Sequence, residues 1–194
     1  MSAAVTLALL FFWSVALNEQ VTEGCTCLPK HPQQQFCASD IVIRAKVIGT
    51  VNSTRPQLTA YKIGTIQTYK QLDKKRIQVI YTRSTQTFCG INLRNGEYLL
   101  SGPVQDGSVV LDLCNRVEPW NQLSRVQKMY LSRYQSGCVC EISPCTGASC
   151  FIEILQKKCL IRVNNSFSLD DEEALQSICL PGSGGFCSWT KFLE

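Results

Sequence analysis

Alternating apolar and polar positions in the first two thirds of the chain predict β-strands. In residues 40–48 every second side chain is apolar and lies on one face, while Arg44 and Lys46 lie on the other. Asp106-Gly107 is a hairpin turn signal between the last two expected strands. Five strands separated by turn signals indicate a small closed or partly closed barrel. The strands expected after the first are residues 61–69, 76–82, 97–101 and 109–113.

A helical period replaces this alternation further along. Ser124 and Gln127 have the spacing of a capping box, and Gly137 closes the segment. We expect this apolar face to pack against the barrel, as an amphipathic helix does. Its members are Val126, Met129, Tyr130, Arg133 and Tyr134.

The segment before the first strand is expected to be extended and exposed. Pro29 and Pro32 both disfavour a helix and restrict the residues before them to extended backbone. His31 stands between Lys30 and Pro32, a polar context that predicts a surface residue.

Residues 1–24 have the pattern of a removable secretory signal. The apolar run 3–17 is too short for a comfortable membrane span, so no membrane span is expected. Thr22 and Gly24 are the small residues expected before a cut at Cys25, although no Lys or Arg precedes the apolar run. A bacterial lipid-attachment signal is the alternative. It fits less well, because Thr22 and Glu23 stand where an aliphatic and a small residue are needed.

The expected secretion determines how the twelve cysteines are interpreted. In an oxidising compartment an even number predicts disulfides rather than zinc ligands, here six bridges whose pairing the spacing alone does not assign. His31 is the single histidine, which leaves little for a histidine-based zinc site or a nucleophilic triad. We therefore expect neither an enzyme nor a cofactor of the chain's own.

The charge of the chain is modest. Without Glu19 and Glu23 of the leader, 19 basic residues face 13 acidic ones, a net charge of +6. This suits weak attraction to acidic matrix polymers. Lys74-Lys75-Arg76 and Lys157-Lys158 are short runs typical of solvated turns, so nucleic-acid binding is not expected.

A change of composition predicts a domain boundary, with one domain at 25–138 and a second at 139–194. From Cys140 onward there are six cysteines in 55 residues and fewer strand patterns. Such a segment builds little core and depends on its bridges. The acidic residues 170–173 favour a helix start capped by Ser168, with a calcium site as the weaker alternative.

Two N-glycosylation sequons stand in expected surface loops. They begin at Asn52 and Asn164.

Several motifs, taken in order, resemble the tissue inhibitors of metalloproteinases over residues 25–194. They are Cys25-Thr26-Cys27, His31-Pro32-Gln33, Phe36-Cys37, residues 42–46, Phe88-Cys89-Gly90, Pro119-Trp120, Leu123-Ser124, Tyr134-Gln135 and Gly137-Cys138, together with the order of all twelve cysteines. The resemblance implies an N-terminal OB-fold (netrin-like) five-stranded barrel with helices, mainly β with some α, followed by a small disulfide-rich C-terminal domain. The bridges it implies are Cys25–Cys89, Cys27–Cys114, Cys37–Cys138, Cys140–Cys187, Cys145–Cys150 and Cys159–Cys179.

The resemblance also implies a secreted inhibitor of zinc matrix metalloproteinases. The α-amino nitrogen and carbonyl oxygen of Cys25 would chelate the zinc of the protease and displace its water, and Thr26 would enter the specificity pocket. Cys27, Leu28 and Pro29 would continue along the cleft. The residues implied on its other side are Gln86, Thr87 and Phe88.

The partners implied are the matrix metalloproteinases in 1:1 complexes, with pro-enzymes bound through the C-terminal domain. Acidic polymers of the extracellular matrix are a further expected partner. The alternative is a secreted netrin-like binding or signalling module that inhibits no protease.

Overall fold

The computed structural model describes residues 25–72, 76–84, 89–151, 157–164, 168–169 and 175–192. The expected leader, the run at Lys74-Lys75, the acidic residues 170–173 and the residues Gln86, Thr87 and Phe88 lie outside the described residues. Within the described part, no helix combines the length and the apolar character needed to cross a membrane.

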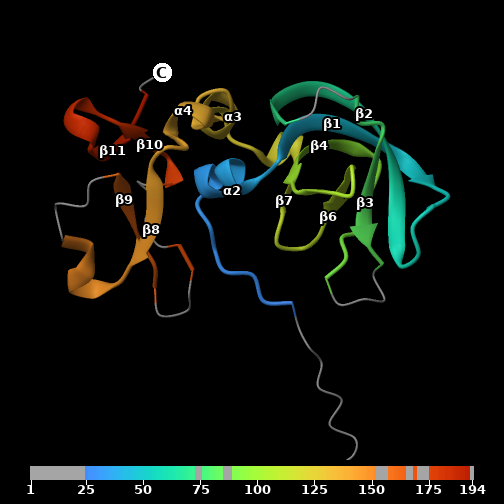
Figure 1. The fold of residues 1–194 in the computed structure, drawn as a ribbon, viewed down its shortest axis with the longest axis horizontal. Helices are drawn as coiled ribbons and strands as arrows, with labels where there is room; N and C mark the ends of the chain where they lie inside the picture. Colours follow the sequence, from blue (N-terminus) through green and yellow to red (C-terminus); the bar gives the residue numbers. More distant parts are fainter. Residues whose placement is uncertain are drawn as a thin grey trace, which may run out of the picture.

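A seven-stranded sheet forms the larger part of the molecule and curls into a half-barrel (Figure 1). Its strand order is β5-β6-β3-β2-β1-β4-β7. Neighbouring strands are antiparallel except β3 and β6, which are parallel. The strands are β1 (Ile41–Val51), β2 (Leu58–Gln71), β3 (Val79–Arg83), β4 (Gly96–Gly102), β5 (Val104–Gln105), β6 (Ser108–Leu111) and β7 (Arg116–Pro119).

The predicted fold class, mainly β with a curled sheet and helices, is confirmed. The five expected strands are β1, β2, β3, β4 and β6, and the short strands β5 and β7 are additional. One pairing expectation was wrong. Asp106-Gly107 joins β5 to β6, not β4 to β6. Both turn residues have positive φ, 49° and 71°, which suits a tight hairpin. A two-residue strand is too short to be recognised by alternation.

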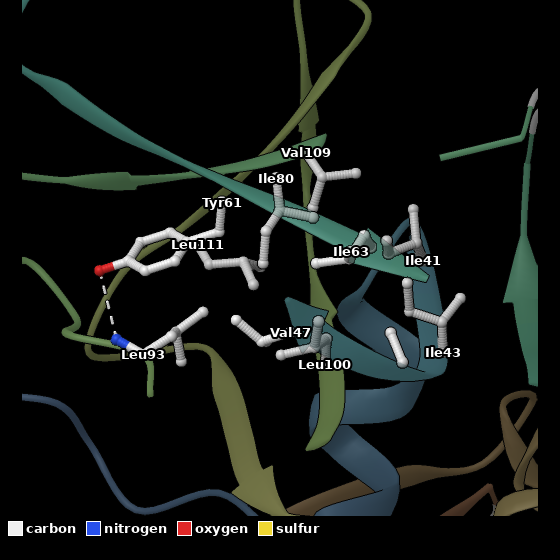
Figure 2. Close-up of a cluster of buried hydrophobic side chains, with 11 residues drawn as sticks. Ile41, Ile43, Val47, Tyr61, Ile63, Ile80, Leu93, Leu100, Val109 and Leu111 are labelled. Carbon is white, nitrogen blue, oxygen red and sulfur yellow. Dashed lines mark hydrogen bonds between the residues drawn. The ribbon is translucent and has the colours of Figure 1, made fainter. Parts of the chain in front are cut away.

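The core of the half-barrel lies on its concave face. Figure 2 shows side chains from β1, β2, β3, β4 and β6 meeting there, with the Leu93 amide donating to the Tyr61 hydroxyl at 3.3 Å. In β1 every second residue from position 41 to 47 points into this core, as the sequence pattern predicts. The buried members are Ile41, Ile43, Ala45, Val47, Tyr61, Ile63, Ile80, Leu93, Leu100, Val109 and Leu111.

The segment before β1 contains a helix, α2 (Pro32–Ala38), so the expectation of extended backbone was wrong for these residues. Pro32 stands at the start of the helix, where its missing N–H costs nothing. The backbone N–H of Gln33 donates to Nδ1 of His31 at 3.1 Å, and the backbone N–H of His31 donates to Oε1 of Gln34 at 2.8 Å. These two bonds form a capping box that begins the helix.

His31 is fully buried, contrary to the expectation of a surface residue. Its ring lies 5.0 Å from that of Trp189, centroid to centroid. Trp189 is 158 positions away in the sequence, so local polarity could not reveal this contact.

The expected helix after the sheet is present as two short helices, α3 (Arg125–Leu131) and α4 (Tyr134–Gly137), after the 3-10 turn η1 (Trp120–Gln122). The capping box is confirmed: the Gln127 amide donates to the Ser124 hydroxyl at 3.1 Å. The helices pack with α2 on the other face of the sheet. The buried residues there are Phe36, Val42, Leu99, Leu123, Tyr130, Leu131, Tyr134 and Ile178.

The C-terminal part consists of two two-stranded sheets on the other side of α2 (Figure 1). Strands β8 (Glu141–Cys145) and β9 (Lys158–Arg162) pair in parallel, and β10 (Ile178–Pro181) and β11 (Cys187–Thr190) pair antiparallel. The turns η2 (Gly147–Phe151) and η3 (Ser183–Gly185) complete it. Its buried core is Cys140, Ile142, Cys159, Ile161 and Cys179.

Candidate functional site

Residues Cys25–Lys30, called the ridge from here on, precede α2 without regular secondary structure. Their exposure alternates. Thr26, Leu28 and Lys30 are exposed, and the residues between them are half-buried. Leu28 exposes 71% of its surface. The ridge therefore presents every second side chain outward, as an extended peptide does.

Two disulfides hold the first half of the ridge. Cys25 is bonded to Cys89, and Cys27 to Cys114, with Cα–Cα distances of 5.6 and 5.3 Å. The two anchoring loops are also joined to each other, because the Leu113 amide donates to the Cys89 carbonyl at 3.0 Å. The two disulfides therefore attach the ridge to two loops that are hydrogen-bonded to each other.

The sequence around each anchor explains its shape. Asp112 Oδ1 accepts a hydrogen bond from the Cys114 amide at 3.0 Å, and the Asn115 side chain accepts one from the Asp112 amide at 2.8 Å. Side-chain acceptors of this kind stabilise a tight turn. At Gly90, a Cβ would lie 2.2 Å from the Arg83 carbonyl oxygen, so only glycine lets the Cys89 loop approach the end of β3.

Leu113 is a candidate residue that the sequence reasoning did not include. It lies between the two anchors and is 53% exposed. A leucine at the end of an expected strand and directly before a cysteine was the available signal. Gln86, Thr87 and Phe88, which are predicted to occupy the other side of the protease cleft, lie outside the described residues. Of that segment the structure places only Cys89, which follows them.

The remaining disulfides join the pairs that the family resemblance implies. They are Cys37–Cys138, Cys140–Cys187, Cys145–Cys150 and Cys159–Cys179. The sulfurs of Cys140, Cys179 and Cys187 lie within 4.8 Å of one another, the one grouping of potential metal ligands among the described residues. All three sulfurs are in disulfides, and thiolate is the form that binds metal, so they do not form a metal site.

A groove of about 670 Å³ separates the second half of the ridge from the C-terminal part. Leu28, Pro29 and Lys30 form one wall, and the opposite wall includes Pro144 and Val163. Lys30 is the one charged residue among the described lining residues.

Both predicted glycosylation sites lie at loops. Asn52 is exposed in the turn between β1 and β2, beside Thr54, whose hydroxyl lies 3.3 Å from that of Tyr81. Asn164 lines the groove and accepts a hydrogen bond from the Ser168 amide at 2.8 Å. Glycosylation at both remains a prediction.

Taken together, a curled β-sheet with a disulfide-tethered ridge beside it defines a disulfide-rich, mainly β protein. A family model described as tissue inhibitor of metalloproteinase matches residues 23–189. The chain therefore belongs to the tissue inhibitor of metalloproteinase family. That family is one of inhibitors and not of enzymes.

Individual relatives are similar in sequence to this chain over most of its length. Metalloproteinase inhibitor 3 of Scyliorhinus torazame is 36% identical, covering 98% of this chain and 92% of the relative. Metalloproteinase inhibitor 4 of Mus musculus is 35% identical, covering 87% and 81%. Metalloproteinase inhibitor 2 of Rattus norvegicus is 34% identical, covering 87% and 82%.

Proposed function

We propose that this protein inhibits zinc metalloproteinases by laying the ridge into their active-site cleft in the manner of a substrate. The observation that carries the proposal is the alternating exposure of Thr26, Leu28 and Lys30 on a segment tethered by two disulfides. A protease cleft binds an extended chain whose alternate side chains enter its pockets.

The proposed contact with the zinc uses the backbone of Cys25. A catalytic zinc keeps one coordination position for water. The α-amino nitrogen and the carbonyl oxygen of one residue form a five-membered chelate ring and can displace that water. Cys25 suits this role because the bridge to Cys89 holds its backbone in place, and the chelate uses only backbone atoms and not the bonded sulfur. The proposal requires removal of residues 1–24, which frees the amine.

The neighbouring residues then have distinct roles. Thr26, exposed next to Cys25, enters the specificity pocket. Cys27, Leu28 and Pro29 continue along the cleft on one side of the zinc. Residues 86–88, which lead into Cys89, fill the other side, and Leu113 adds apolar contact between the anchors.

The bridges also explain how so short a ridge could bind tightly. Ordering a flexible segment on binding costs about 0.5–1.5 kcal/mol per immobilised side chain, and a segment that is ordered beforehand avoids much of this cost. Rigid protease inhibitors rank among the tightest complexes of their interface size. We further propose a 1:1 complex, a secreted protein, and additional contacts of the C-terminal part with pro-enzymes and with acidic matrix polymers.

The deciding experiment compares two N-termini. Secreted protein is sequenced from its N-terminus and titrated against the catalytic domain of a collagenase-type zinc protease. A matched variant carries one extra alanine before Cys25. The extension displaces the amine from the chelate, so we expect affinity to fall by more than about 100-fold, the size of an interface hot spot. Equal inhibition by both proteins would exclude chelation by Cys25. No inhibition by either would favour a binding or signalling module.

The amine also predicts a pH dependence. Only the neutral amine coordinates a metal, and a free α-amino group has a pKa of about 7.7–8.0. Affinity should therefore weaken as the pH falls below the pKa of this amine. The measurement is the inhibition constant between pH 6 and pH 9, corrected for the titration of the protease itself. A flat corrected profile would count against direct coordination.

A further inference from the structure

The second half of the ridge, Leu28–Lys30, follows the last anchored cysteine, Cys27, and leads directly into α2. The two disulfides therefore fix only the first half. The second half runs on into His31, the residue that begins the helix. The position of the helix start consequently determines where the second half of the ridge lies.

The end of α2 is attached to the end of α4 and to the seven-stranded sheet. Cys37 is bonded to Cys138, and Phe36 is buried against the sheet with α3 and α4. The ammonium group of Lys70 on β2 donates to the carbonyl oxygens of Phe36 and Cys37 at 3.3 and 2.7 Å. The pKa of Lys70 is lowered, chiefly by burial.

The beginning of α2 is attached to the C-terminal part instead. The His31 ring packs against Trp189 of β11, whose indole N–H donates to the Leu160 carbonyl on β9 at 2.8 Å. Gln34 Nε2 donates to the Ile142 carbonyl on β8 at 2.6 Å. The start of the helix thus contacts two strands of the C-terminal part directly, β11 and β8, and Trp189 joins β11 to β9.

Gln33 strengthens the same attachment from a fully buried position. Its Nε2 donates to the carbonyl oxygens of Gly137 and Cys179 at 3.0 and 2.8 Å, and its Oε1 accepts from the Cys179 amide at 2.8 Å. One side chain therefore forms three hydrogen bonds, two of them to the backbone of β10.

We propose that the C-terminal part positions the second half of the ridge through the start of α2, with His31 and Gln34 as positioning residues. The proposal rests on the inhibitory role of the ridge. In this arrangement the N-terminal loops hold the zinc-binding end, and the C-terminal part holds the end that carries Leu28 and Lys30. The C-terminal part is then a determinant of how long the protease complex lasts, through residues that do not themselves contact the protease.

Gln34→Glu tests this attachment selectively. The carboxylate keeps an oxygen that can accept from the His31 amide, so the capping box is retained. It loses the N–H that donates to Ile142 and places a negative oxygen against that carbonyl. Gln35→Glu is the matched control, because it makes the same charge change one position later. No described hydrogen bond of the Gln35 side chain reaches the C-terminal part.

We expect Gln34→Glu to raise the dissociation rate constant of the protease complex about 3- to 10-fold, the effect of one lost hydrogen bond of ordinary strength. Gln35→Glu should stay within about 2-fold of wild type. Rates are measured by surface plasmon resonance on an immobilised collagenase-type catalytic domain. Equal dissociation rates for the two variants would overturn the proposal.

A second readout does not need the protease. Amide order parameters from ¹⁵N relaxation report the mobility of Leu28 and Lys30 in the free protein. They should fall in Gln34→Glu and not in Gln35→Glu. If wild type fails to inhibit while this difference is present, the inhibitory function is wrong and the positioning stands. If wild type inhibits and the order parameters do not differ, the positioning is wrong.

A second pair of variants tests the same attachment through the aromatic contact. Trp189→Leu removes the ring beside His31, whereas Trp189→Phe keeps one. Aromatic pairs contribute enough for a change of about 2- to 10-fold. We expect faster dissociation for Trp189→Leu and near wild-type behaviour for Trp189→Phe. Wild-type rates for both would contradict a role for the ring.

Discussion

The seven-stranded sheet and the C-terminal part are each stabilised by a different kind of interaction. The concave core of the sheet contains eleven buried residues, none of them a cysteine. The C-terminal core contains five, of which three are half-cystines, and three of the six bridges lie wholly within this part. A segment of about 55 residues buries too little apolar surface to fold on that basis alone. Burial therefore stabilises the first region, and covalent constraint the second.

The largest effect should come from a cavity in the sheet. Leu100 of β4 is fully buried and pairs with Ile43 and Val117 on the neighbouring strands. We expect Leu100→Ala to lower the free energy of unfolding by about 4 kcal/mol, because the surrounding strands cannot close the space. Urea unfolding followed by circular dichroism measures it.

Leu28→Ala is the control for this substitution. The same atoms are removed from a side chain that is largely exposed, so stability should change by less than about 0.5 kcal/mol. Equal costs at the two leucines would mean that burial does not distinguish the core from the ridge.

The sequence predicted the sheet well because its signal is local. In β1 the alternate residues Ile41, Ile43, Ala45 and Val47 are all buried in one core, and only Val42, which packs on the other face, departs from the alternation of buried and exposed positions. The short strand β5 and the parallel pairing of β6 with β3 have no such local signal, since they depend on partners elsewhere in the chain. Those features were missed.

A missing bridge should give the next largest effect. Replacing Cys159 and Cys179 with alanine opens a loop between residues 20 positions apart. The loop-closure entropy of such a loop is worth about 3 kcal/mol. We expect the C-terminal part to unfold first while the sheet remains folded. In a Trp120→Phe background the fluorescence of Trp189 follows the C-terminal part, and circular dichroism follows the sheet. A single transition seen by both probes would contradict this.

In the candidate site, too, the features that depend on nearby residues could be predicted, and those that depend on distant residues could not. Leu28 and Thr26 were predicted from motif resemblance, and their exposure fits a ridge. His31 was misplaced because two prolines favoured an extended exposed segment. Proline at the first position of a helix is the exception to that rule, and the Trp189 ring that buries His31 is remote in sequence.

An alkaline transition should come next in size. Burial raises the pKa of Tyr134 to about 12, with the Arg116 guanidinium acting in the opposite direction. The unfolded phenol ionises near pH 10, so between pH 10 and pH 12 the unfolded state holds fewer protons than the folded state. Stability should therefore be complete below pH 10 and fall by roughly 2–3 kcal/mol as the pH rises to 12.

Tyr134→Phe tests this assignment, because it removes the titrating group and keeps the ring. The difference in unfolding free energy between wild type and this variant is measured at pH 9 and pH 11 in freshly prepared samples. It should shift in favour of the variant at the higher pH. An unchanged difference would assign the alkaline loss to other groups.

The smallest expected loss of stability concerns the joint between the two regions, the contact of Gly137 and Gln33 with Cys179. Gly137 ends α4, and a Cβ there would lie 2.3 Å from Nε2 of Gln33 and 2.4 Å from the carbonyl oxygen of Cys179. Gly137→Ala must therefore push the two regions apart or break the hydrogen bonds of Gln33. Overpacking of this kind costs about 2 kcal/mol. We expect that loss, measured by thermal unfolding, together with earlier unfolding of the C-terminal part.

Gly64→Ala on β2 is the matched control, because a Cβ there meets nothing within 4 Å. It should leave stability within about 0.5 kcal/mol of wild type. If Gly137→Ala lowers the sheet and C-terminal transitions equally, the joint makes one cooperative unit of the two regions. If it lowers only the C-terminal transition, each region keeps its own source of stability and the Gln33 contacts merely align them. If it changes neither, the joint contributes little to either, and the attachment of α2 to the C-terminal part is weaker than its hydrogen bonds indicate.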